Sequence, residues 1–148
     1  MNQLKLSLLL ADDDLDDCDF FKDALKEIST QATLSTVNDG VELMNLLLSE
    51  QEPYPDIIFL DLNMPRKSGL ECITEIKAID KLKHIPIIIF STSLDKLVVN
   101  QLYEIGAYYY IQKPGGFTIL KKVIEKAIML FLSNNPQQPP RDRFELQP

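Results

Sequence analysis

The sequence predicts an α/β fold in which helices cover both faces of a parallel five-stranded sheet. Five short apolar segments alternate along the chain with five longer segments whose apolar residues recur at helical spacing. Several of the short segments are apolar throughout, as expected for strands that are buried on both faces. Strict alternation of strands and helices favours parallel strands joined by right-handed crossovers.

The predicted strands are short and largely apolar, and each is followed by polar residues or a turn. They span residues 4–11, 33–37, 57–60, 86–90 and 108–111. The third strand ends abruptly at Asp61, and Pro65 closes the segment that follows. A carboxylate at the end of so apolar a strand is costly to desolvate unless another group compensates it.

The predicted helices begin and end at recognisable signals. They span residues 14–28, 41–50, 70–79, 95–104 and 117–133. Asp14 is a natural N-cap for the first, residues 38–40 form a turn before the second, and Gly106 suits the C-cap of the fourth.

One domain is expected over residues 1–133, followed by a polar, proline-rich tail over residues 134–148. The composition of the tail predicts a disordered or loosely docked segment, for which Phe144 and Leu146 are candidate anchors.

Composition narrows the classes of function. The net charge is −7, which argues against non-specific binding to nucleic acid or to an anionic membrane. No apolar run is long enough to span a membrane, and the first residues do not resemble a signal peptide. Cys18 and Cys72 lack CxxC spacing, so we expect reduced thiols and a cytoplasmic protein.

Polar residues with complementary chemistry follow four of the five strands. Asp12 and Asp13 follow the first strand, and Asp61 follows the third. Ser91 is the first of the hydroxyl residues after the fourth strand, and Lys113 follows the fifth. Each has an ordinary structural explanation: a helix cap, a turn, a strand-end hydroxyl or a solvated lysine. Since the carboxyl ends of parallel strands share one edge of the sheet, their coincidence favours a functional site.

The residue types indicate phosphoryl chemistry with a divalent cation. Three carboxylates cannot all stay ionised at close range without a compensating charge. Oxygen ligands without nearby histidine or cysteine favour Mg²⁺, or Mn²⁺, over zinc. Asp61 is then the candidate nucleophile, and Lys113 and Ser91 would neutralise and orient the phosphoryl oxygens.

Five separated motifs support a family resemblance over most of the chain. They are LLADDD, DLNMP, IIFSTS, GAYYY and KP, at residues 9–14, 61–65, 88–93, 106–110 and 113–114. These five motifs resemble, in the same order, those of the receiver domain of two-component response regulators. That domain has the CheY-like, flavodoxin-like fold. The resemblance implies a doubly wound (βα)5 sheet with strand order 2-1-3-4-5.

The resemblance also implies roles for the strand-end residues. Asp61 would accept a phosphoryl group from a histidine kinase or a phosphotransfer protein, and Lys113 would bind that group. Asp12, Asp13, Asp61 and the main-chain carbonyl of Asn63 would hold the Mg²⁺ ion.

A second set of residues would report and time the phosphorylated state. Ser91 and Tyr110 occupy the two switch positions of the family. Asn63 and Ser93 stand where side chains tune the lifetime of the phosphoryl group, and both are small and neutral here.

The implied protein is a single-domain switch and not a turnover enzyme. Its output would be a surface change on the fourth helix, fifth strand and fifth helix, read by an unidentified protein target without direct binding to nucleic acid or membrane. The same face is a candidate surface for a homodimer. The alternative function is that of a phosphorelay intermediate, which passes the phosphoryl group from Asp61 to a histidine phosphotransfer protein.

The last predicted helix carries two apolar lines. The expected core stripe is Phe117, Leu120, Ile124, Ala127 and Phe131. A second line, Ile119, Val123 and Leu130, predicts a surface for a partner.

Overall fold

The computed structural model describes residues 5–28, 31–49, 54–133 and 137–148. Strands and helices alternate along these residues. In chain order they are β1 (Leu6–Ala11), α1 (Leu15–Lys26), β2 (Ala32–Val37), α2 (Gly40–Leu48), β3 (Ile57–Leu60), α3 (Gly69–Ala78), β4 (Ile87–Ser91), α4 (Lys96–Ile105), β5 (Tyr109–Gln112), α5 (Phe117–Ser133) and a 3-10 turn, η1 (Arg141–Arg143).

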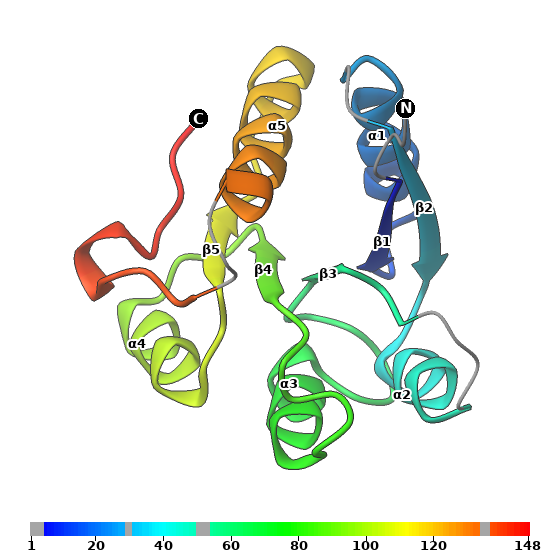
Figure 1. Cartoon of the computed structure of the whole chain (residues 1–148), viewed down its shortest axis with the longest axis vertical. Helices are drawn as coiled ribbons and strands as arrows, with labels where there is room; N and C mark the ends of the chain where they lie inside the picture. Colours follow the sequence, from blue (N-terminus) through cyan, green and yellow to red (C-terminus); the bar gives the residue numbers. More distant parts are fainter. Residues whose placement is uncertain (1–4, 29–30, 50–53, 134–136) are drawn as a thin grey trace.

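The five strands form one parallel sheet in the order β2-β1-β3-β4-β5. Helices α1 and α5 cover one face, and α2, α3 and α4 cover the other (Figure 1). The predicted fold class and strand order are therefore confirmed. No helix in the described part of the chain is long and apolar enough to cross a membrane.

All ten predicted helices and strands are present, and no bound differs from the prediction by more than two residues. The expected N-cap Asp14 accepts hydrogen bonds from two amides of the first turn of α1. Gly106 ends α4 with a φ of 114°, a left-handed conformation that favours glycine. Two predicted element ends, residues 4 and 50, lie outside the described residues.

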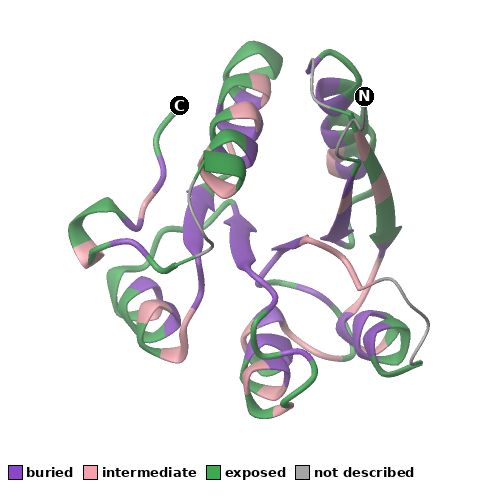
Figure 2. Cartoon of the chain, viewed as in Figure 1, coloured by how far each residue is buried: buried purple, intermediate pink, exposed green. Residues whose placement is uncertain are grey.

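The sheet separates two apolar cores. The central strands β3 and β4 are buried along their whole length (Figure 2), which explains why their sequences are apolar without alternation. One core lies under α2, α3 and α4, and the other lies under α1 and α5. Phe21 fills the second core, where its ring packs edge-on against Phe59 and Phe90.

The apolar lines of α5 differ from the prediction. Val123 is buried and not part of an exposed partner surface, and Ile128, which was not predicted, is fully buried. Phe117 is 37% exposed, although it was expected in the core stripe. The buried face of the helix is therefore shifted from the predicted stripe and consists of Leu120, Val123, Ile124, Ala127 and Ile128.

The C-terminal tail is held more firmly than its composition predicts. Phe144 is fully buried, and its ring packs edge-on against Tyr103 at a centroid distance of 5.1 Å. Gln138 donates hydrogen bonds to the carbonyls of Tyr103 and Ala107, and the Tyr103 hydroxyl donates to the carbonyl of Pro139. Residues 137–148 dock through Phe144 and Leu146, the two candidate anchors, which are both buried, and through these hydrogen bonds.

The tail extends the sheet beyond β5. The amide of Tyr110 donates to the carbonyl of Phe144 at 3.0 Å, and the amide of Leu146 donates to the carbonyl of Tyr110 at 2.8 Å. Glu145 thereby forms a parallel bridge with Tyr110. The tail runs along the edge strand beside α4 (Figure 1), so the outer edge of the sheet is covered by the chain itself.

Candidate functional site

The ends of β1 and β3 are tied together where their acidic residues begin. The amide of Asp61 donates to the carbonyl of Ala11 at 2.9 Å, and the amide of Asp12 donates to the carbonyl of Val37 at 3.0 Å. These bonds continue the sheet ladder one residue beyond the strands. They fix the backbone from which the two carboxylates project.

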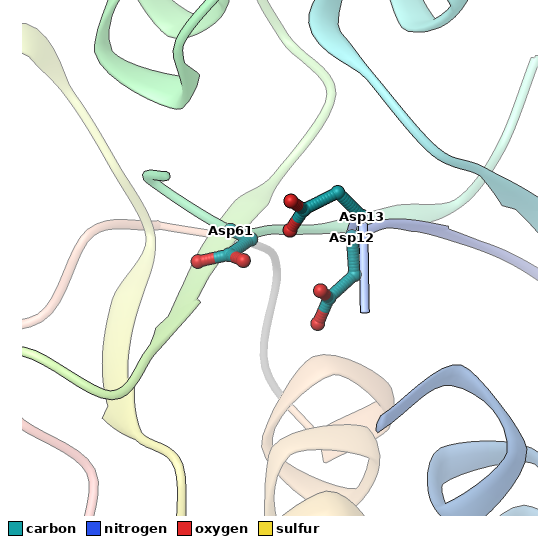
Figure 3. Close-up of side chains that lie close together, drawn as sticks. All are labelled: Asp12, Asp13 and Asp61. Carbon is teal, nitrogen blue, oxygen red and sulfur yellow. The ribbon is translucent and has the colours of Figure 1, made fainter. Parts of the chain in front are cut away.

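The three predicted carboxylates meet at this edge. Oxygen atoms of Asp12, Asp13 and Asp61 lie within 4.8 Å of one another, and the three side chains surround a common space (Figure 3). Asp12 is fully buried and Asp61 is 5% exposed, whereas Asp13 is exposed. The cluster therefore has two buried members and one that is open to solvent.

Lys113 supplies the positive charge of the site. Its Nζ lies 2.8 Å from Asp12 Oδ2, 2.8 Å from Asp17 Oδ2 and 3.5 Å from Asp61 Oδ2. Burial by itself lowers the pKa of this lysine, but the adjacent carboxylates of Asp12, Asp17 and Asp61 raise the pKa above its ordinary value. The ammonium therefore stays charged.

The ionised form of Asp61 is destabilised by its surroundings. Burial raises its pKa from 3.8 to about 6, Lys113 opposes this shift, and the neighbouring charge of Asp12 adds to it. One lysine does not fully compensate the cluster. A further positive charge would stabilise the ionised, nucleophilic form of Asp61.

The donor set fits a hard divalent cation. In the described part of the chain, Asp12 Oδ2 is buried and accepts no hydrogen bond of normal geometry, despite its close approach to the Lys113 ammonium. A buried carboxylate oxygen in this state is suited to ligate a metal ion. Asp12, Asp13 and Asp61 all offer carboxylate oxygens, the ligands that Mg²⁺ and Mn²⁺ prefer.

The predicted switch residues lie beside the carboxylates and contact one another. Ser91 is fully buried at the end of β4, and its Oγ lies 3.2 Å from Ser93 Oγ. Tyr110 is also buried, and its hydroxyl donates a hydrogen bond to the backbone carbonyl of Ser93. The ring thus already points inward, and the loop after β4 links the two switch positions.

Asn63 lies at the mouth of the site. Its side chain is exposed, and its backbone amide donates a long hydrogen bond of 3.4 Å to Asp61 Oδ1. This contact places the Asn63 backbone next to the cluster. The roles of its carbonyl as a metal ligand and of its side chain in lifetime tuning stay predictions.

One residue of the site was missed in the sequence. Asp17, on the first turn of α1, is not among the predicted site residues, but it forms an ion pair of 2.8 Å with Lys113. Helical side chains lean toward the N-terminus of their helix, so a first-turn acid leans back over the strand ends. That direction is the signal that could have identified it.

Comparison with known proteins gives the family. The family model described as the response regulator receiver domain matches residues 8–125. The chain belongs to the response regulator receiver domain family. As a receiver domain it is a response regulator of two-component signalling, and its family implies a kinase partner.

Individual relatives agree with this assignment. The receiver domain is 32% identical to response regulator Rcp1 of Synechocystis sp. over 122 residues, which cover 80% of this chain and 83% of Rcp1. It resembles the crystal structure of the phosphorylated cyanobacterial phytochrome response regulator RcpA, with a TM-score of 0.80, 31% identity and coverage of 88% and 96% of the two chains. The Mn²⁺-bound form of Rcp1 matches with a TM-score of 0.77, 29% identity and coverage of 91% and 99%.

Proposed function

We propose that Asp61 accepts a phosphoryl group from a histidine kinase in a reaction that needs Mg²⁺, or Mn²⁺ as a substitute. An Asp61 carboxylate oxygen would attack the phosphorus of phosphohistidine, forming an acyl phosphate as the nitrogen–phosphorus bond breaks. The observation that carries the proposal is the position of Asp61: a buried carboxylate at a strand end, beside Lys113 and two further carboxylates.

The surrounding residues have separate tasks. Asp12, Asp13 and Asp61 would hold the cation together with the Asn63 carbonyl, and the ion supplies charge neutralisation for the incoming phosphoryl oxygens. The ammonium of Lys113 would shift its 3.5 Å contact from Asp61 to a phosphoryl oxygen.

The Ser91 hydroxyl and the Tyr110 ring would transmit the effect of phosphorylation from Asp61 to the surface. Ser91 Oγ, held by Ser93, would turn to bind another phosphoryl oxygen. Since the Tyr110 hydroxyl is bonded to the Ser93 carbonyl, movement of the loop between them changes the environment of the Tyr110 ring. Ser93 and Asn63 carry no charge, so we expect a phosphoryl lifetime between the extremes of the family.

The signal would leave through the face formed by α4, β5 and α5, where the tail is docked. Both backbone groups of Tyr110 are hydrogen-bonded to the tail, and the Tyr110 ring lies 6.5 Å from that of Phe144. A change at Tyr110 is therefore transmitted directly to the tail. A protein target, or a second copy of the chain in a homodimer, would recognise this composite surface.

The protein would act as a switch in the cytoplasm and not as a turnover enzyme. Two free, buried thiols support a reducing compartment. A phosphorelay intermediate would use the same site, but the relatives named above are response regulators, which favours the terminal switch. Rapid transfer from phosphorylated protein to a histidine phosphotransfer domain would instead support the relay.

The test is labelling by acetyl phosphate, followed by intact-protein mass spectrometry. We expect one phosphoryl group per chain with Mg²⁺, none in EDTA, and none in Asp61→Asn with Mg²⁺. Asp19→Asn, an exposed acid of α1, is the matched control and should label normally. Stoichiometric labelling of Asp61→Asn would refute the assignment of the phosphoacceptor.

A further inference from the structure

We propose that Asp17 is a positioning residue that holds the Lys113 ammonium over Asp61 throughout the phosphorylation cycle. The inference rests on the proposed function, because it concerns how the lysine reaches a phosphoryl group on Asp61. It assigns a role to an acid that lies outside the predicted set of site residues.

Asp17 accepts a well-formed hydrogen bond from the Lys113 ammonium. The ammonium donates a hydrogen bond of 2.8 Å to Asp17 Oδ2, whereas its hydrogen bond to Asp61 Oδ2 is long, at 3.5 Å. Its approach to Asp12 Oδ2 is close but lacks hydrogen-bond geometry. Asp17 therefore makes the best-formed hydrogen bond to this ammonium among the described side chains.

The contact with Asp17 is compatible with a loaded site. Asp17 is not a member of the carboxylate cluster suited to a cation, which consists of Asp12, Asp13 and Asp61. An ion bound there would draw Asp12 away from Lys113 but would leave Asp17 in place. Since an ammonium has three N–H groups, one can remain on Asp17 while another binds a phosphoryl oxygen.

The amide of Lys113 donates to the carbonyl of Ser91 at 2.8 Å, but the loop that follows Lys113 is lightly packed. Added side chains at Gly115 and Gly116 would meet no atom within 4 Å, so the residues after Lys113–Pro114 face open space. Asp17 stands on a firmer base, because its own amide is hydrogen-bonded to the cap residue Asp14 at 3.2 Å. The ion pair thus ties a lightly packed loop to the fixed first turn of α1.

Asp16 separates this role from an effect on the helix dipole. It is an acid of the same first turn, its amide is bonded to the same cap at 3.0 Å, and its side chain is exposed. Asp16→Asn removes the same charge from the same helix end but does not remove the contact with Lys113. It is therefore the matched control for Asp17→Asn.

The experiment measures the rate of labelling by acetyl phosphate at saturating Mg²⁺ in a double-mutant cycle. We expect Asp17→Asn to slow labelling about tenfold, the usual lower range for loss of a residue that orients an active group, and Asp16→Asn to leave the rate unchanged. In a Lys113→Gln background Asp17→Asn should have no further effect, because its action passes through the lysine. Asp17→Glu should restore part of the rate.

Three results would overturn the inference. They are equal rates for Asp17→Asn and Asp16→Asn, an equal slowing by Asp17→Asn with and without Lys113, and a faster rate for Asp17→Asn. Circular dichroism of each variant verifies the fold. If the wild-type protein labels normally and Asp17→Asn does too, only this inference fails; if the wild-type protein does not label at all, the proposed function fails.

A second measurement does not depend on phosphorylation. Proton–nitrogen NMR detects lysine ammonium groups whose exchange with water is slowed by ion pairs. We expect a Lys113 signal, assigned by its loss in Lys113→Gln, that persists in Asp16→Asn and disappears in Asp17→Asn. Persistence of the signal at an unchanged shift in Asp17→Asn would show that Asp17 does not hold the lysine.

Discussion

Gly69, the first residue of α3, packs directly against the backbone of Asp61. A Cβ atom at Gly69 would overlap the carbonyl oxygen of Asp61 and would lie 2.8 Å from the Cα of Leu62. The Gly69 amide donates to the Leu62 carbonyl at 2.9 Å, which closes the loop between β3 and α3. The start of α3 thus supports the backbone of the proposed nucleophile.

Gly69→Ala is expected to destabilise the protein and to disturb Asp61. The added methyl group meets backbone atoms that cannot move aside, as in other overpacked sites, so we expect a loss of about 2 kcal/mol in the free energy of unfolding. Urea denaturation measures this loss. Labelling by acetyl phosphate should also slow, because the Asp61 carbonyl is displaced.

Gly116→Ala is the control for this substitution. A Cβ at Gly116 meets no atom within 4 Å, so the free energy of unfolding should change by less than about 0.5 kcal/mol. An equal effect of the two substitutions would contradict the importance of the Gly69 contact.

The pKa of Asp61 predicts how stability depends on pH without metal. Because burial raises this pKa from 3.8 to about 6, the folded protein binds the proton more tightly than the unfolded chain does. The stability that proton binding to Asp61 contributes is therefore fully present below about pH 4 and is lost as the pH rises through about 6. Above that pH the ionised carboxylate is a cost relative to a neutral residue at the same position.

Asp61→Asn should remove this cost. At about pH 7.5 in EDTA we expect the substitution to raise the free energy of unfolding by about 2 kcal/mol. Loss of the contact between Asp61 and Lys113 would reduce this gain. Near pH 4 the gain should vanish, because Asp61 is then protonated in the folded protein. Mg²⁺ should stabilise the wild-type protein more than the variant. Denaturation at the two pH values measures the effect, and a variant less stable than wild type at the higher pH would contradict it.

Much of the fold and the centre of the site could be predicted because they follow from local rules. The uniformly apolar strands define the sheet, and parallel strands must end at a common edge, which brings Asp12, Asp61 and Lys113 together. These conclusions need no knowledge of how individual side chains pack.

The parts that could not be predicted depend on contacts between distant residues. Phe144 could be named as a candidate anchor of the tail, but its packing against Tyr103, on α4, does not follow from the sequence. Val123 is buried because α5 packs with a different face inward from the predicted one, and periodicity alone does not decide between neighbouring faces. Asp17 contacts Lys113, which lies 96 residues away in the sequence, so a local pattern around Asp17 does not predict its partner.

The two cysteines are expected to be unreactive in the folded protein. Both are free and buried, and burial raises the pKa of each thiol to about 11. At about pH 8 roughly one thiol in a thousand is ionised, so alkylation should be very slow until denaturant exposes both groups. Mass spectrometry after iodoacetamide treatment measures this, and rapid modification of Cys18 or Cys72 without denaturant would contradict their burial.

Phe144→Ala is expected to release the tail from β5. The fully buried ring contacts both Tyr103 and Tyr110, and truncation of such a phenylalanine costs about 3 kcal/mol, enough to detach a short segment. The Tyr110 amide loses its acceptor, the Phe144 carbonyl, so its hydrogen exchange should accelerate strongly. Phe20→Ala, which removes the same side chain from a site that is 55% exposed, should leave that exchange unchanged. Unaltered protection of Tyr110 in Phe144→Ala would mean that the backbone bonds hold the tail without this anchor.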